Sequence, residues 1–321
     1  MRKTLILGLL LASARWLVAA QNAEHAFDYD QKASLDMQEK GTAKRGDVSV
    51  LDISYASPKG GRVPAYLVVP SGKGSFAAVI WGHWYWSTSP ARNRSEFLDE
   101  AVALAPSGVV SLLTDGPVAR PGHGKDNDPT SEAQAAELIQ QIIDMRRGVD
   151  LLLARKDVDP QRIAYVGHSY NATVGAFLSG IDKRFKAFVL MAGGLSDAVD
   201  RKSKEYEEFR QKVGPEKFDA FQSKYAWLDP GRFVSHASPA VVFMQYGSQD
   251  LPFLTPERDR EYAKVVSEPK KFQIYDAPHA LNAAARRERL AFLVEQLRLQ
   301  PISSSIVTAI PDLYQPPDQG Q

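Results

Sequence analysis

Apolar residues in this chain gather in short runs that are separated by longer stretches with an amphipathic pattern. A short run that is mostly apolar is typical of a strand buried on both faces of a sheet. Six runs have this strand character: 76–81, 109–113, 163–166, 188–191, 241–245 and 272–275. Two further runs, 48–55 and 62–69, flank a turn rich in Pro and Gly and predict an antiparallel hairpin at the edge of the sheet.

Helical patterns fill the intervals between several of these runs. Residues 130–155 carry apolar side chains at steps of four and three, which predicts a long helix with one face on the sheet. These side chains are Leu138, Ile142, Met145, Val149 and Leu152. Shorter helical patterns lie at 95–105 and 288–299. Strands that alternate with helices predict an α/β fold, with a mostly parallel sheet and helices on both faces. Functional groups then belong at the carboxyl ends of the strands.

Composition excludes several classes of protein. The chain has 321 residues, of which 44% are hydrophobic and 24% charged, so it suits one large α/β domain or two small ones. The 39 basic and 38 acidic residues nearly balance and give no electrostatic basis for nucleic-acid binding. The chain has no cysteine, which excludes disulfides and thiolate metal sites. We find no His-Glu-x-x-His metal motif, no phosphate-binding Gly-rich loop and no dinucleotide fingerprint, so the sequence itself names no metal site.

The first 20 residues predict a secretory signal peptide. Arg2 and Lys3 precede an apolar stretch at 4–12, and small residues at 18–20 offer a cleavage site after Ala20. The alternative is a membrane anchor, but the apolar stretch is short for spanning and Arg15 interrupts it. We therefore expect a secreted or periplasmic protein with no stable membrane insertion after cleavage.

Ser169 occupies the most informative position. The strand-like run 163–166 leads into Gly167-His168-Ser169, and a helical pattern follows. A serine on a strand-to-helix turn is typical of a nucleophile elbow, in which helix-initiating N–H groups lie beside the hydroxyl. The alternative is a chance Gly-x-Ser in a loop. The elbow pattern expects a small residue two positions after the serine, and this chain has Asn171 there.

A serine nucleophile needs a base, and the base needs an orienting acid. In the elbow architecture the order along the chain is serine, acid, histidine. His279 follows the last strand-like run and is the predicted base. Asp250 follows the run 241–245 and is the predicted acid. Asp276 is the competing acid, but it lies only three residues before His279.

The oxyanion of such a reaction needs two N–H donors. We expect one from the backbone of Tyr170 and the other from the loop after the run 76–81, through Trp84 or Tyr85, with Tyr85 preferred. His83, Trp84 and Trp86 in this loop are candidates for the wall of a substrate pocket, although some of them would serve equally as core.

The serine elbow, the acid loop and the histidine loop, in this order along the chain, resemble the α/β-hydrolase superfamily. They are most similar to those of dienelactone-hydrolase-like and prolyl-oligopeptidase-like serine esterases. The resemblance rests on residues 157–169, 243–250 and Pro278-His279 and spans about residues 48–300. It implies an eight-stranded, mostly parallel sheet and a mechanism that needs no cofactor. The chain departs from the family pattern at Asn171 and at Trp84, where the family has glycine. These departures either narrow the pocket or mark a site without activity.

Three segments complete the predicted organisation, in which 1–20 is the signal peptide and 21–300 the catalytic domain. Residues 21–46 form a polar N-terminal arm. Residues 195–235 are charged but carry Phe218, Phe221 and Tyr225 at helical spacing, which predicts a small helical cap over the site or a solvated excursion without a role. Residues 301–321 are rich in Pro, Ser and Gln and predict an extended or disordered tail.

The prediction is a secreted serine hydrolase that cleaves a small-molecule carboxylic ester through an acyl-enzyme. Ser169 attacks, His279 carries the proton and Asp250 orients the imidazole. One alternative is a serine peptidase that acts on short peptides, and another is a non-catalytic binding protein on the same fold.

Overall fold

A computed structural model describes residues 25–122, 128–194 and 196–313. Its centre is a nine-stranded sheet with the order β1-β2-β3-β5-β4-β6-β7-β8-β9. The strands are β1 (Gln38–Arg45), β2 (Val48–Ala56), β3 (Arg62–Val69), β4 (Phe76–Gly82), β5 (Val109–Thr114), β6 (Val158–His168), β7 (Ala187–Met191), β8 (Val241–Gln249) and β9 (Lys270–Pro278). Six neighbouring strands, β5, β4, β6, β7, β8 and β9, are parallel to one another. Strands β1, β2 and β3 pair antiparallel, and β3 is also antiparallel to β5. The carboxyl ends of the six parallel strands therefore meet at one edge.

The sheet has one strand more than the eight that the family resemblance implies. The additional strand is β1, which pairs with β2 at the sheet edge and occupies part of the segment expected to be an arm. Every residue of β1 is exposed. Its sequence therefore lacks the alternation of apolar and polar positions by which a half-buried strand is recognised. The predicted hairpin corresponds to β2 and β3, one strand inside the edge.

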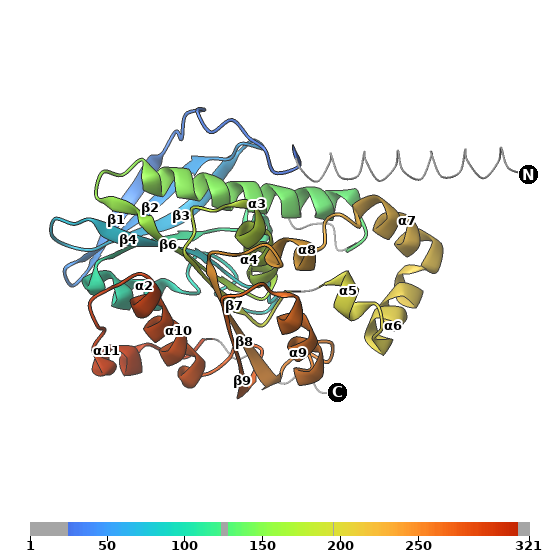
Figure 1. Ribbon diagram of the computed structural model, residues 1–321. Helices are drawn as coiled ribbons and strands as arrows, with labels where there is room; N and C mark the ends of the chain where they lie inside the picture. Colours follow the sequence, from blue (N-terminus) through green and yellow to red (C-terminus); the bar gives the residue numbers. More distant parts are fainter. Residues whose placement is uncertain (1–24, 123–127, 195, 314–321) are drawn as a thin grey trace, which may run out of the picture.

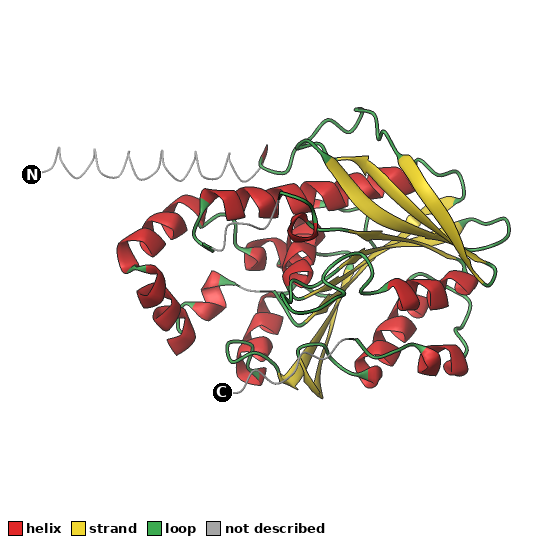
Figure 2. Ribbon diagram, turned by 180° about the vertical axis from the view of Figure 1, so that it is seen from behind, coloured by secondary structure: helices red, strands yellow, loops and turns green. Residues whose placement is uncertain are grey.

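Helices cover both faces of the sheet (Figures 1 and 2). One face packs against α3 (Glu132–Leu153), α4 (Tyr170–Ile181), α8 (Pro230–Val234) and α9 (Pro256–Val265). The other face packs against α2 (Leu98–Leu104), α10 (Ala283–Gln296) and α11 (Ser304–Ala309). Two 3-10 turns, η1 (Ala105–Ser107) and η2 (Pro117–Ala119), lie in the connections. The sheet is thus the middle layer between two apolar cores, as the alternation of elements predicts.

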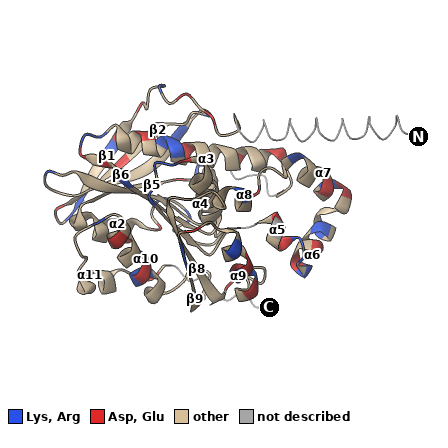
Figure 3. Cartoon of the chain, in the orientation of Figure 1, with Lys and Arg blue, Asp and Glu red and all other residues tan. Residues whose placement is uncertain are grey.

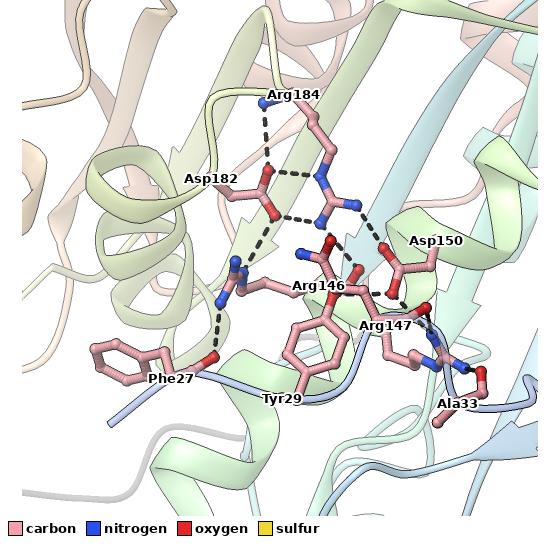
Figure 4. A network of polar contacts seen from close by, with 9 residues as sticks. Phe27, Tyr29, Ala33, Arg146, Arg147, Asp150, Asp182 and Arg184 are labelled. Carbon is pink, nitrogen blue, oxygen red and sulfur yellow. Dashed lines mark hydrogen bonds and ion pairs between the residues drawn. The ribbon is translucent and has the colours of Figure 1, made fainter. Parts of the chain in front are cut away.

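An arginine cluster fastens the N-terminal arm to helix α3 (Figure 4). Arg146 donates to the carbonyl of Phe27 at 2.6 Å, and Arg147 donates to the carbonyls of Gln31 and Ala33. Tyr29 donates its hydroxyl to Asp150 at 2.9 Å. The arm is held by backbone carbonyls rather than by apolar side chains alone, which explains why its sequence looks polar.

The segment between β7 and β8 forms α5 (Asp197–Asp200), α6 (Lys204–Val213), α7 (Pro215–Tyr225) and α8. Helices α5, α6 and α7 project beyond the sheet, and α6 and α7 carry side chains of both signs (Figures 1 and 3). Ion pairs from Lys217 to Asp128 and from Lys224 to Glu132 join α7 to the start of α3. The insertion therefore lies at the carboxyl end of the strands. Helix α8 differs, since its Val234 is part of the core.

The C-terminal segment is not extended throughout its described part. Residues Ser304–Ala309 form helix α11, and Val307 and Ile310 are buried against the core next to α2. Ile302 and Leu313 are partly buried against the same core. These few apolar side chains are spread among polar ones, so the composition of the segment concealed the helix. The rest of the predicted tail, 314–321, and the predicted signal peptide lie outside the described residues.

Candidate active site

Ser169 lies at a sharp turn between the end of β6 and the start of α4. Its backbone angles, φ 55° and ψ −115°, are unusual for a residue with a side chain. Neighbouring glycines make the turn possible. A Cβ on Gly167 would lie 2.2 Å from the carbonyl oxygen of Asn171, and one on Gly193 would lie 2.3 Å from that of Ser169. The strained backbone and the close approach match the predicted elbow.

The structure brings Ser169, His279 and Asp250 together. The Nε2 atom of His279 lies 2.8 Å from Ser169 Oγ, and its Nδ1 atom lies 2.6 Å from Asp250 Oδ1. The His279 and Asp250 side chains are almost fully buried, with 5% and 0% exposed. A proton on Nδ1 that is donated to the carboxylate leaves Nε2 free to accept the serine proton.

Asp276, the competing acid, lies elsewhere. It is exposed, and Gln249 and Ser248 donate hydrogen bonds to its Oδ1. Asp250 also accepts the backbone N–H of Leu251 at 2.6 Å, which helps to hold the carboxylate in place. Between the two carboxylates, the geometry selects Asp250 as the partner of His279.

The two candidate oxyanion donors lie on residues whose rings stack. The rings of Tyr85 and Tyr170 are 4.1 Å apart with planes 11° from parallel. Tyr170 begins helix α4, where the first N–H groups have no partner within the helix. The backbone N–H of Trp84 is bound instead to Glu96 Oε2 at 2.6 Å. The sequence offered the backbone N–H of either Trp84 or Tyr85 as the second oxyanion donor. Because the Trp84 N–H already binds Glu96, Tyr85 is the remaining candidate.

His83 holds the loop that carries these residues. Its Nδ1 donates to the carbonyl of Trp84 at 2.7 Å, and its Nε2 accepts the N–H of Gly116 at 2.8 Å. Burial lowers the pKa of His83 to about 4, although the bond to Trp84 opposes this shift. His83 is therefore neutral at pH 7 and acts as a clamp between two loops.

The three aromatic residues proposed for a pocket wall lie at different depths. His83 and Trp84 are buried, with 2% and 0% exposed, so they lie behind the site rather than on a surface open to a substrate. Trp86 is partly exposed, and its ring lies 5.5 Å from that of His279. Trp86 is therefore the member of the group whose side chain reaches the surface beside His279.

The structure gives a physical reason for Asn171. Its side chain is buried and turned toward residues 83–86 after β4, the candidate oxyanion loop, where Nδ2 donates to the carbonyl of His83 at 2.5 Å. Its Oδ1 accepts from Gln141 at 3.0 Å. A Cβ on Gly82 would lie 2.6 Å from that of Asn171, so the glycine at the end of β4 provides the space. Asn171 thus ties the elbow to the loop instead of narrowing a pocket.

Two further candidate functional residues, Glu96 and His168, were not predicted from the sequence. The Glu96 carboxylate lies 2.5 Å from Nδ1 of His168, and Nε2 of His168 lies 2.9 Å from the backbone carbonyl of His279. Both side chains are buried. Position 168 attracted notice only as part of the elbow, and no spacing rule connects it with position 96. Burial of a glutamate and a histidine becomes visible only in three dimensions.

Burial also perturbs groups around the site. The pKa of Tyr170 is raised well above its usual value, chiefly by burial and then by Tyr85. The pKa of Asp259, in α9, is raised to about 7 by burial, with Asp250 adding to the shift and Arg258 opposing it. Among residues 25–122, 128–194 and 196–313, no group of three His, Asp or Glu side chains has a metal-binding arrangement. Within the same ranges no helix is long and apolar enough to cross a membrane.

Comparison with known proteins gives one curated relative and a consistent set of structures. No family model matches the chain. The polyketide transferase ATR5 from Stachybotrys chlorohalonatus is 24% identical over 247 residues, which cover 62% of this chain and 81% of the relative. The acetyl xylan esterase from Paenibacillus sp. R4 superposes with a TM-score of 0.68 at 19% identity, over 86% of this chain and 93% of that one.

A third similar protein is named as an α/β-hydrolase. The α/β-hydrolase GrgF from Penicillium sp. sh18 superposes with a TM-score of 0.57 at 17% identity, over 77% of this chain and 98% of that one. The same fold is indicated by the strand order, by the elbow after β6 and by these superpositions. The chain has the α/β-hydrolase fold.

Proposed function

We propose that the protein is a serine hydrolase that cleaves carboxylic esters through an acyl-enzyme. The observation that carries this proposal is the continuous contact from Ser169 Oγ through His279 to Asp250, at 2.8 and 2.6 Å. These distances lie within the reach that proton transfer requires.

Each residue has a definite part in the proposed reaction. His279 Nε2 takes the Ser169 proton as Oγ attacks the ester carbonyl, and the imidazolium then gives that proton to the leaving alkoxide. Asp250 holds the ring and stabilises its positive charge. The backbone N–H groups of Tyr170 and Tyr85 are the proposed donors to the oxyanion. Water activated by His279 then cleaves the acyl-enzyme and restores Ser169.

An ester is the preferred substrate class because the structural neighbours include proteins named as esterases. The partly exposed Trp86 beside His279 suits the apolar part of a small ester. Hydrolysis of short peptides by the same residues is the first alternative. The second is a non-catalytic binding protein, against which the assembled contact between Ser169 and His279 argues.

The test is labelling by a fluorophosphonate probe, which reacts with activated serines. We expect labelling of the native protein and none of the Ser169→Ala variant or of heat-denatured protein. A panel of 4-nitrophenyl esters and matched amides then separates esterase from peptidase. An added alcohol separates hydrolysis from acyl transfer, the class in the name of the curated relative. A folded protein that takes up no probe would favour the binding protein.

The proposal includes export of the protein. It rests on the charged start, the short apolar stretch and the small residues at 18–20. Expression in a bacterium with intact secretion, followed by mass spectrometry of the exported chain, is expected to find Gln21 at the N-terminus. An uncleaved chain in the membrane fraction would favour the anchor.

A further inference from the structure

The carboxylate of Glu96 binds two parts of the candidate site at once. Its Oε2 accepts the backbone N–H of Trp84 at 2.6 Å, and its Oε1 lies 2.5 Å from His168 Nδ1. Only 1% of the Glu96 side chain and none of the His168 side chain is exposed. A carboxylate with no access to water needs such partners, since an unpaired buried charge is strongly unfavourable.

Proton counting constrains this pair. The carbonyl oxygen of His279 has no proton, so Nε2 of His168, 2.9 Å away, must donate. One further proton lies between His168 Nδ1 and Glu96, whichever of the two carries it. The pair is therefore neutral overall in either arrangement, and both ring nitrogens of His168 are committed.

Ring packing fixes the same imidazole in a second way. The indole of Trp84 stacks on His168 with centroids 4.9 Å apart and planes 21° from parallel. The same indole lies 6.3 Å from the ring of His279, with planes 10° from parallel. His168 therefore cannot turn without moving Trp84 and the loop that holds His279.

We infer that Glu96 and His168 are positioning residues for the proposed reaction, on which this inference rests. His168 precedes Ser169 in the chain and holds the backbone of His279, so it sets the separation between nucleophile and base. Glu96 holds the N–H of Trp84, so it sets the direction of the neighbouring Tyr85 N–H. One buried carboxylate thereby aligns the base and the oxyanion donor together.

The simpler interpretation is a buried pair that only stabilises the fold. Stability alone does not separate the two, because removal of either partner of a buried pair is destabilising in both cases. A positioning role makes a different prediction for kinetics. Misplacement of the reacting groups lowers kcat and leaves KM nearly unchanged, and the loss is recovered by any side chain that restores the hydrogen bonds.

The first test compares Glu96→Ala with Glu96→Gln in hydrolysis of 4-nitrophenyl acetate. In Glu96→Gln the amide oxygen still accepts from Trp84, the amide N–H donates to His168 Nδ1, and neutral His168 still donates to His279. We expect kcat to fall by about 100-fold in Glu96→Ala at nearly constant KM, and by less than about tenfold in Glu96→Gln. Equal losses in the two variants, or a folded Glu96→Ala variant with the kcat of the wild type, would overturn the inference.

A second pair covers the case in which Glu96→Ala does not fold. His168→Phe keeps the ring stack on Trp84 and loses both hydrogen bonds, whereas the amide of His168→Gln still reaches the carbonyl of His279. We expect His168→Gln to retain at least about ten times the kcat of His168→Phe. A His168→Phe variant with wild-type kcat would show that the pair is only structural.

A third test does not depend on activity. Proton NMR of the inactive Ser169→Ala variant is expected to show a strongly deshielded proton from the short contact between Glu96 and His168. This resonance should survive addition of Asp250→Asn, which removes the buried carboxylate beside His279, and disappear on addition of Glu96→Gln. Its absence from Ser169→Ala, or its persistence with Glu96→Gln, contradicts the pairing. If Ser169→Ala shows the resonance but the wild-type protein hydrolyses no ester, the proposed function is refuted and the pairing is left intact.

Discussion

Asn171 is the residue at which the chain departs from the elbow pattern, and the structure predicts what its loss costs. In Asn171→Ala, the His83 carbonyl loses its donor and the Gln141 amide loses its acceptor. Each buried polar group left without a partner costs about 1–3 kcal/mol, and entry of water into the vacated space recovers part of that. We expect a loss of about 2–4 kcal/mol in the free energy of unfolding, or roughly 3–6 °C in Tm for a chain of this size.

Gly82 supplies a matched partner for a double-mutant cycle. In the wild-type background a methyl group at position 82 would lie 2.6 Å from Asn171 Cβ and 2.7 Å from Tyr165 Oη. We expect Gly82→Ala to cost about 1–3 kcal/mol from overpacking. In an Asn171→Gly background the first contact is gone and only the tyrosine hydroxyl remains. The combined loss should therefore be smaller than the sum of the single losses by about 0.5–2 kcal/mol.

Urea unfolding of the four proteins, followed by tryptophan fluorescence, measures the cycle, and the rate of 4-nitrophenyl acetate hydrolysis follows the loop. Since Asn171 holds the loop through the carbonyl of His83, kcat should fall in Asn171→Ala and Asn171→Gly. Strict additivity at positions 82 and 171 would refute the packing argument. An Asn171→Ala protein with unchanged stability and unchanged kcat would show that this asparagine holds nothing.

Other variants test different parts of the structure. Asp250→Asn should lower kcat by about 10³–10⁴-fold with the fold retained by circular dichroism, because the ring of His279 loses its orienting charge; a loss below tenfold would exclude Asp250 as the acid. For Asp259, burial raises the folded-state pKa to about 7, so the folded state binds the extra proton and stability falls as pH rises between about 4 and 7. Asp259→Asn removes this loss, so its unfolding free energy should exceed that of the wild type by more at pH 8 than at pH 5, and a constant difference would contradict the shift. Arg147→Met should release the N-terminal arm, cost about 2–4 kcal/mol and speed proteolysis within residues 25–37, whereas Arg45→Met, at an exposed ion pair, should cost under about 1 kcal/mol.

Much of the fold and of the candidate site could be predicted from short patterns of residues along the chain. The runs at 76–81, 188–191 and 241–245 correspond to strands of the structure, because a strand buried on both faces is mostly apolar along its length. The residues Ser169, Asp250 and His279 were found because the fold fixes their order and places each after a particular strand. Both kinds of information are local in the sequence, so one sequence suffices to read them.

Elements that depend on distant partners were missed. The exposed strand β1 is held by its backbone pairing to β2, and backbone pairing leaves no mark on side-chain type. Helix α11 is anchored by a few apolar residues within a segment of tail-like composition. Glu96 and His168 lie 72 residues apart along the chain. In each case the deciding contact joins segments that no periodicity connects.

The candidate oxyanion loop, residues 83–86, shows why the sequence alone does not separate an aromatic residue of a pocket wall from one of the core. His83 and Trp84 are neighbours of Tyr85 and Trp86, and the four look alike as candidates for a pocket wall. In the structure His83 and Trp84 use their polar atoms inward, on Gly116, Glu96 and Ser89. In the proposed reaction such residues align the reacting groups, so we expect their substitution to act on kcat. We therefore expect substrate preference to depend on Trp86 and on the α5–α7 insertion, because selectivity between esters requires a surface that the ester touches.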